Sequence, residues 1–236
     1  MKNLDIIMPV KDSLATANQA IKAILDSGFV VRVYDDFSSQ ESFAELDDLA
    51  QKWGFDIVHL SNLTTHPSPN YRLVLCLAQQ KAIDNNADLM IIESDVIINK
   101  NTIELLHKEA QKEHIGIVAA ATEDENHNIN YPYEFAAHAA AEGKETWQTD
   151  KHLSFCCTIL TNRLLHAFSF NLLDEKKNWY DVFLSHQSLE LGFKNVLMPN
   201  NRVLHLPHSS RPWKKLKYTN PILYYWRKLT KRLDRI

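Results

Sequence analysis

Acidic side chains gather at two places where an apolar run of the sequence ends. Asp35 and Asp36 follow one run, while Glu93 and Asp95 follow another and are separated by Ser94. Two carboxylates spaced around one residue at the end of a buried strand can both face one cleft. Their oxygens suit Mg²⁺ or Mn²⁺, and a diphosphate can complete the coordination. The alternative is that these acids are ordinary loop residues or helix caps.

Several catalytic signatures are missing from the sequence. No GxGxxG follows the first apolar run and no GxxxxGK[ST] occurs, so dinucleotide oxidoreductases and P-loop enzymes lose their main support. GxSxG, HExxH and protein-kinase signatures are also absent. The three cysteines, two of them adjacent, give neither a disulfide framework nor a CxxC metal motif, which favours a reducing compartment.

The elements that must position the acids alternate regularly through the first half of the chain. Short β-branched or apolar runs predict strands, and apolar residues at helical spacing between them predict helices. Such alternation indicates an α/β fold, with a mostly parallel central sheet and helices on both faces. Ligands of these sheets bind beyond the carboxyl ends of the strands. The predicted strands are 4–9, 29–34, 55–60, 88–92 and 115–121; the predicted helices run from Leu14, with Asp12 or Ser13 as cap, to Gly28, and over 43–53, 71–86 and 102–112.

The pattern changes after Thr122. Residues 123–151 are polar and irregular, and 154–160 predicts a further strand. A helix stopped by Gly192 and a final strand, 195–198, ending at Pro199 complete the pattern. The length and the apolar share of 45% fit one domain, residues 1–210, followed by an extension, 211–236.

The order of these motifs resembles the family 2 glycosyltransferases, inverting enzymes with the GT-A fold. The resemblance spans residues 4–210, with 1–121 as the nucleotide-sugar-binding half and 122–210 as the acceptor-binding half. It is carried by IIMPVKDS, VYDDFSS and IIESDVII, then by SFCCTILTNRLLHAF and LLDEKKNWYDVFLSHQSLELGFKNVLMPNNRVLHLPHSS.

The resemblance implies a role for individual residues. Pro9 and Asp36 match positions that hold the nucleobase, and acceptance of the uracil N3–H by Asp36 favours a UDP donor. Glu93 and Ser94 fall in the nucleotide-binding acidic motif. The remaining matches are Asp95 as direct ligand of Mn²⁺ or Mg²⁺, His205 as the histidine completing that site with His208 as alternative, and Asp181 as general base.

The implied activity is metal-assisted transfer of a sugar, with inversion, to a hydroxyl of a glycan or lipid-linked acceptor, as in bacterial polysaccharide biosynthesis. The sequence departs from the family pattern in several places: Glu93 replaces Asp, Tyr180 and Phe183 stand where acids are usual beside the base, and the usual Arg further along that helix is missing, with Gln187 and Ser188 there instead. Two alternatives follow. One is a non-catalytic nucleotide-sugar-binding or scaffold protein. The other is a GT-A-like nucleotidyltransferase, which the lack of a Gly- and Arg-rich loop after the first strand disfavours.

The end of the chain has a different charge from the rest. From Arg211 to Ile236 nine Lys or Arg accompany one acid, a charge of +8, so residues 1–210 carry −11 of the net −3. After Pro221 apolar residues recur at helical spacing and basic residues lie between them, which predicts a basic amphipathic helix. Residues 213–236 would contact an anionic membrane surface, or pack on the body or a second subunit of a homo-oligomer. The acidic body disfavours nucleic acid.

A cytoplasmic protein, peripheral at the inner membrane face, is expected, because neither a signal peptide nor a transmembrane run is found.

Overall fold

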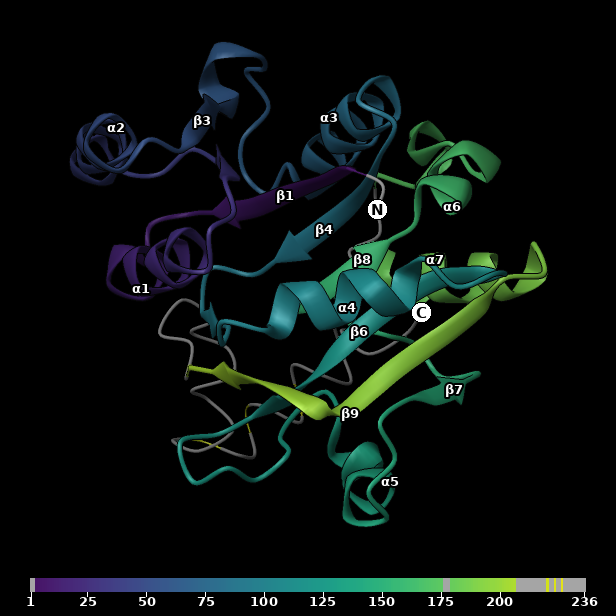
Figure 1. The fold of residues 1–236 in the computed structure, drawn as a ribbon. Helices are drawn as coiled ribbons and strands as arrows, with labels where there is room; N and C mark the ends of the chain where they lie inside the picture. The colour runs from purple at the N-terminus through teal and green to yellow at the C-terminus, as the bar shows by residue number, and fades with distance from the viewer. Residues whose placement is uncertain (1–2, 176–178, 207–219, 221–222, 224–225, 227–236) are drawn as a thin grey trace. The chain divides into compact units, whose positions relative to one another are not determined.

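A nine-stranded sheet with helices on both sides makes up the described part of the chain (Figure 1). The computed structural model describes residues 3–175 and 179–206, together with Asn220, Leu223 and Trp226. The strands are β1 Asn3–Val10, β2 Val31–Asp35, β3 Asp56–His59, β4 Ala87–Ile92, β5 Val96–Ile97, β6 Ile115–Glu123, β7 Trp147–Thr149, β8 Cys157–Leu160 and β9 Lys194–His205. The helices are α1 Leu14–Asp26, α2 Gln40–Trp53, α3 Tyr71–Asp84, α4 Thr102–Ala110, α5 Ala137–Ala141, α6 Asn162–Ala167 and α7 Tyr180–Glu190, with 3₁₀ turns Leu60–Asn62, Glu134–Ala136 and Phe170–Leu172.

The strand order explains where a ligand can enter. Along the sheet the strands follow β3-β2-β1-β4-β8-β6-β9-β5, and β7 pairs with β9. The first four of these strands are parallel neighbours. The chain moves outward from β1 to β2 and β3, then returns to place β4 on the other side of β1. Strand order therefore reverses between β1 and β4, and ligands of open α/β sheets bind at the carboxyl ends of strands at such a reversal.

The side chains of β1 show how the core is divided between the two faces of the sheet. Ile6, Met8 and Val10 belong to one apolar cluster, which also contains residues of α1, α2 and α4. Ile7 belongs to the second cluster, with residues of α3, α6 and α7. Successive side chains of a strand point to opposite faces, so both faces of the sheet are covered. This confirms the predicted mostly parallel α/β architecture.

The predicted elements match the observed ones, with differences at their ends. Gly54 closes α2 with φ of 76°, a left-handed conformation that glycine adopts without penalty. At the start of α1 the expected cap is not made, because Ser13 has φ of 48° and its side chain makes no capping hydrogen bond. The later strand β8 is antiparallel to both β4 and β6.

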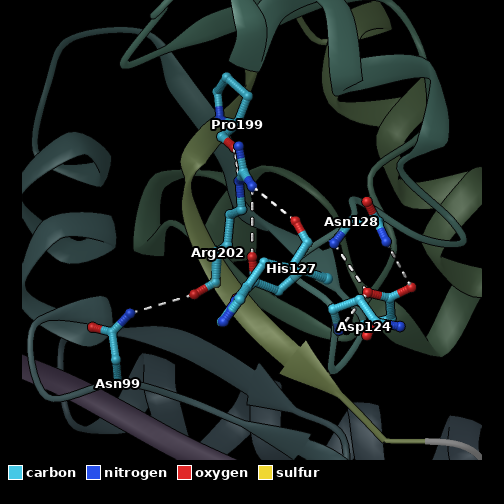
Figure 2. Close-up of polar contacts among 8 residues, drawn as sticks. Asn99, Asp124, His127, Asn128, Pro199 and Arg202 are labelled. Atoms are coloured by element: carbon cyan, nitrogen blue, oxygen red, sulfur yellow. Dashed lines mark hydrogen bonds and ion pairs between the residues drawn. The ribbon is translucent and has the colours of Figure 1, made fainter.

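The last strand does not end at Pro199 as predicted. Its pairing with β6 jumps from Ala120↔Met198 to Ala121↔Arg202, so residues 199–201 bulge out of the ladder. A proline, which has no N–H to donate, is tolerated at such a bulge. Figure 2 shows Arg202 closing the bulge: its Nε donates to the Pro199 carbonyl at 3.3 Å, and its guanidinium also donates to the His127 carbonyl at 3.2 Å. The strand then continues in register to His205.

The chain divides into two compact units, residues 1–206 and 207–236. His208 and nearly all of the basic extension lie outside the described residues, so the amphipathic helix and its membrane contact stay predictions. Within the extension, the backbone N–H of Leu223 donates to Oδ1 of the Asn220 side chain at 3.1 Å. In the part of the chain that the structure describes, no helix has both the length and the apolar character needed to cross a membrane.

Candidate nucleotide and metal site

The loops that follow β1 and β2 are tied together at the carboxyl end of the sheet. The backbone N–H of Asp36 donates to the Val10 carbonyl at 2.8 Å. The Asp12 N–H donates to the Ser38 hydroxyl at 2.8 Å, and the Ser39 N–H donates to the Asp12 carboxylate at 2.7 Å. Left-handed backbone recurs here at Asp12, Ser13 and Phe37, with φ between 48° and 59°. Non-glycine residues hold this conformation only where the surroundings enforce it, and such residues cluster at functional sites.

The Asp36 carboxylate, assigned to the nucleobase by resemblance, anchors a third loop. Its Oδ2 accepts from the Ser68 hydroxyl at 2.8 Å and from the Asn70 backbone N–H at 2.9 Å. Its Oδ1 accepts from Asn70 Nδ2 at 2.8 Å. A carboxylate oxygen can accept two hydrogen bonds, so a further donor at Oδ1 is compatible with this network. Pro9 pairs with Tyr34 in the adjacent β1–β2 ladder, so the two predicted nucleobase residues lie on neighbouring strand ends.

The neighbouring Asp35 belongs to a structural cluster. Its side chain is fully buried, and its Oδ2 lies 2.8 Å from Nδ1 of His59. The other ring nitrogen of His59 lies 2.9 Å from Asp47, and the ring stacks on Phe43 with centroids 3.6 Å apart. Ser38 N–H donates to the second Asp35 oxygen. Of the two acids that end β2, Asp35 is therefore used to hold β2, β3 and α2 together.

The pairing of β5 with β9 brings His205 to Asp95. Val96 is the register partner of His205, and the Leu206 N–H donates to the Asp95 carbonyl at 2.9 Å. As a result Nε2 of His205 lies 3.1 Å from Oδ2 of Asp95, whose side chain is 1% exposed. The two residues named as metal ligands by resemblance, 110 positions apart in sequence, are thus in direct contact.

The protonation of His205 is set by its neighbours. Nδ1 of His205 lies 3.1 Å from the Tyr131 carbonyl, which can only accept, so Nδ1 carries a proton and Nε2 is the ring nitrogen that faces the Asp95 carboxylate. Burial lowers the pKa of His205, but the hydrogen bond and charge of Asp95, the charge of Glu93 and the Tyr131 carbonyl outweigh it, so the net pKa is raised. A cation at Nε2 must therefore displace a proton more often than at an ordinary histidine.

Glu93 lies beside this pair and faces a cysteine. Its N–H donates to the Cys156 carbonyl at 2.9 Å, and Sγ of Cys156 lies 3.5 Å from Oε2 of Glu93. Ligand atoms of Glu93, Cys156 and His205 all lie within 4.8 Å of one another, a spacing that one metal ion can bridge. Ser94, half-buried, occupies the turn between Glu93 and Asp95, which is closed by a bond from Val96 N–H to the Glu93 carbonyl.

Asp181 connects to the cluster through residues 153–156. It lies in the first turn of α7, where Ser185 Oγ donates to its carbonyl at 2.7 Å and accepts from Leu153 N–H at 2.9 Å. The next residue, Ser154, contacts Cys156, with Oγ and Sγ 3.2 Å apart. The charge of Asp181 reaches the buried Tyr133, whose pKa is raised first by burial and then by Cys156 and Asp181.

The structure thus joins Glu93, Asp95 and His205, and sets Asp36 against a different loop. The functional assignments of these residues and of Pro9, Ser94 and Asp181 stay predictions. Sequence reasoning missed Cys156, Tyr131 and the 66–70 loop. The only signal for the loop was its proline-rich sequence, HPSPN. Neither Cys156 nor the Tyr131 carbonyl carries a motif.

Comparison with known proteins places this arrangement in a fold class. No family model and no curated protein matches the sequence. Among solved structures, GalNAc-T7 with UDP, GalNAc and Mn²⁺ superposes with a TM-score of 0.66 at 11% identity, over 89% of this chain and 45% of that chain. The fold is the GT-A fold. Two structures of TarS from S. aureus agree, with TM-scores of 0.61 and 0.57 at 14% and 16% identity, over 97% and 87% of this chain and 40% and 60% of theirs.

At these identities the likeness concerns the GT-A fold alone. The chain spans about half the length of GalNAc-T7. GalNAc-T7 and TarS are GT-A glycosyltransferases, so the GT-A fold that the sequence resemblance implied is confirmed. Membership of family 2 stays a prediction.

Proposed function

We propose that this protein is an inverting glycosyltransferase that moves a sugar from a nucleotide-sugar to a hydroxyl of a glycan or lipid-linked acceptor. The observation that carries the proposal is the Asp95–His205 contact, 3.1 Å long, beside Glu93 at the carboxyl end of β4 in a GT-A fold. Carboxylates and a histidine with a fixed tautomer form a donor set that fits a divalent cation.

The donor is proposed to be a UDP-sugar. GalNAc-T7 was crystallised with UDP and Mn²⁺. By resemblance, Asp36 matches the family position that accepts a hydrogen bond from the uracil N3–H. Asp36 is also held by the 66–70 loop, so the acceptor atom is preorganised before a nucleotide arrives. Asp95 and His205, with Glu93 beside them, would hold Mn²⁺ or Mg²⁺. The bound cation would neutralise charge that develops on the diphosphate leaving group.

Asp181 is proposed as the general base. Its carboxylate would take the proton from the acceptor hydroxyl while that oxygen forms a bond to the anomeric carbon, and the bond from that carbon to the diphosphate breaks. With the base and the leaving group on opposite sides of the carbon, the configuration inverts. The Ser185 and Leu153 contacts keep the start of α7 next to residues 153–156, and the last of these, Cys156, accepts the backbone hydrogen bond of Glu93.

A two-stage experiment tests the proposal. A thermal-shift screen of UDP-, GDP- and dTDP-sugars with Mn²⁺ identifies the donor, and turnover is then followed by release of the nucleoside diphosphate. We expect stabilisation by one UDP-sugar and metal-dependent release of UDP. Loss of Asp95 or His205, as Asp95→Asn or His205→Gln, should lower turnover by about 10²-fold or more. His127→Gln, an exposed histidine paired with Glu123, is the matched control and should keep full activity.

Other outcomes identify the competing functions. Pyrophosphate release from a nucleoside triphosphate would indicate a nucleotidyltransferase. Tight nucleotide-sugar binding without turnover of any donor would indicate a binding or scaffold protein.

A further inference from the structure

Cys156 is the feature of the site that the resemblance does not account for. It immediately precedes β8, which runs antiparallel to β4, and the register partners Ile92 and Cys157 put Glu93 directly opposite Cys156. Residues opposite each other on paired strands project to the same side. This pairing, closed by the Glu93 N–H bond to the Cys156 carbonyl, is why the thiol and the carboxylate lie 3.5 Å apart.

The thiol is enclosed among groups that bind cations. Cys156 is 3% exposed, and its sulfur also lies 3.2 Å from the Ser154 hydroxyl. Oxygen of Glu93, nitrogen of His205 and sulfur of Cys156 fall within 4.8 Å of one another. Mg²⁺ prefers oxygen ligands alone, whereas a thiolate together with imidazole and carboxylate favours Zn²⁺ and Co²⁺.

We propose that Cys156 is a metal ligand of this site and that, with Glu93 and His205, it makes the site prefer a thiophilic divalent cation such as Zn²⁺ or Co²⁺ over Mg²⁺. The inference rests on the proposed function in placing a metal at this site. The Asp95 carboxylate lies 3.1 Å from Nε2 of His205 and so faces the same ion beside these three residues, while the Tyr131 carbonyl holds Nδ1 on the other side of the ring. Binding releases the thiol proton to solvent, since the ligand is the thiolate. Burial and the charge of Glu93 raise the pKa of the Cys156 thiol.

Cobalt is the probe that tests the inference, because a thiolate bound to Co²⁺ gives a charge-transfer absorption band in the near ultraviolet. The full-length protein is titrated with Co²⁺ alone. We expect the band in the wild type and in the controls Cys157→Ala and Cys76→Ser, which each remove one of the other two thiols. Cys156→Ser should abolish the band and weaken Co²⁺ binding by about ten-fold or more. Zn²⁺ should displace Co²⁺ at equal concentration, while a large excess of Mg²⁺ should not.

The results separate this inference from the proposed function. A band that persists in Cys156→Ser, Co²⁺ binding without a band, or no Co²⁺ binding would each overturn the role of Cys156. If UDP release with Mn²⁺ is normal in any of those cases, the proposed function stands alone. If the band behaves as expected but no donor is turned over, the metal assignment stands and the proposed function fails. Circular dichroism of Cys156→Ser, and of Cys156→Ala as a second variant, checks that the fold is retained, so that loss of the band can be assigned to loss of the thiol.

Discussion

Removing the Asp36 carboxylate should lower stability as well as nucleotide binding. The magnitude follows from its three hydrogen bonds. The Asn70 N–H is buried and would lose its acceptor, at a cost of about 1–3 kcal/mol. The Ser68 hydroxyl is only partly buried and can turn to water, and Asn70 Nδ2 keeps a second bond, to the His66 carbonyl at 3.1 Å. The free energy of unfolding should therefore fall by about 2 kcal/mol in Asp36→Ala.

Calorimetry and urea unfolding of the ligand-free protein measure this change. For a chain of this length, about 2 kcal/mol lowers Tm by about 4–8 °C. Asp36→Asn should be intermediate, because the amide restores one oxygen but turns a donor toward groups that also donate. The matched control is Asp56→Ala, which removes an exposed ion pair with Arg32, and such pairs contribute about 0–1 kcal/mol.

UDP titration of the same variants separates the two roles of Asp36. We expect Asp36→Ala to lose UDP affinity, and Ser68→Ala to keep both stability and affinity because it removes only the water-accessible bond. An unchanged Tm for ligand-free Asp36→Ala would refute the argument that this carboxylate anchors the 66–70 loop. Direct contact with the base would then be its sole remaining role.

Three further outcomes are expected. Asp181→Asn should reduce transfer by about 10²–10⁴-fold at unchanged donor affinity, and full transfer would remove it as general base. Burial raises the pKa of Asp88, but its hydrogen bonds outweigh this and the net pKa is lowered; its contribution to stability is then present above pH ~4 and lost as pH falls through the folded-state pKa. Urea unfolding of Asp88→Asn between neutral and acid pH should show a flatter pH dependence than the wild type. Gly116→Ala puts a Cβ 2.7 Å from Cβ of Phe193 and also against Ser188 Oγ, so thermal unfolding should report a loss of about 1–3 kcal/mol.

The fold was predictable from sequence where local signals and burial agree. In the first half, each strand is a short apolar run and each helix has a periodic apolar face, so both periods can be read without knowing the partner. Gly54 marks the end of α2 because the left-handed turn there needs no side chain. The prediction that the last strand ends at Pro199 was wrong. It rested on the rule that a proline ends a regular ladder of backbone hydrogen bonds, which does not hold at a bulge. Only the bulge of three residues, closed by Arg202 and by the pairing of β9 with β6, lets the strand continue.

The site was predictable only in part, because contacts between residues distant in the chain decide what each side chain does. Acids at strand ends signal a ligand-binding edge, but sequence cannot tell which of two neighbours is used internally. Asp35 and Asp36 are adjacent, yet one is fully buried against His59 and the other bonds the 66–70 loop. Those partners come from β3 and from the start of α3, so the difference between the acids arises from contacts distant in the chain.

Position 93 shows how such contacts change the meaning of a residue. Read alone, Glu93 is a departure from the family pattern, a side chain longer than Asp by one methylene, or about 1.5 Å. In the sheet it stands opposite Cys156, and the added reach brings its carboxylate to 3.5 Å from the sulfur and within bridging distance of His205. An aspartate here would end short of the sulfur because the paired backbones fix the starting points of both side chains. The long acid and the thiol therefore form one cross-strand unit, and the substitution that weakens the family resemblance is the one that allows a sulfur ligand beside the Asp95–His205 pair.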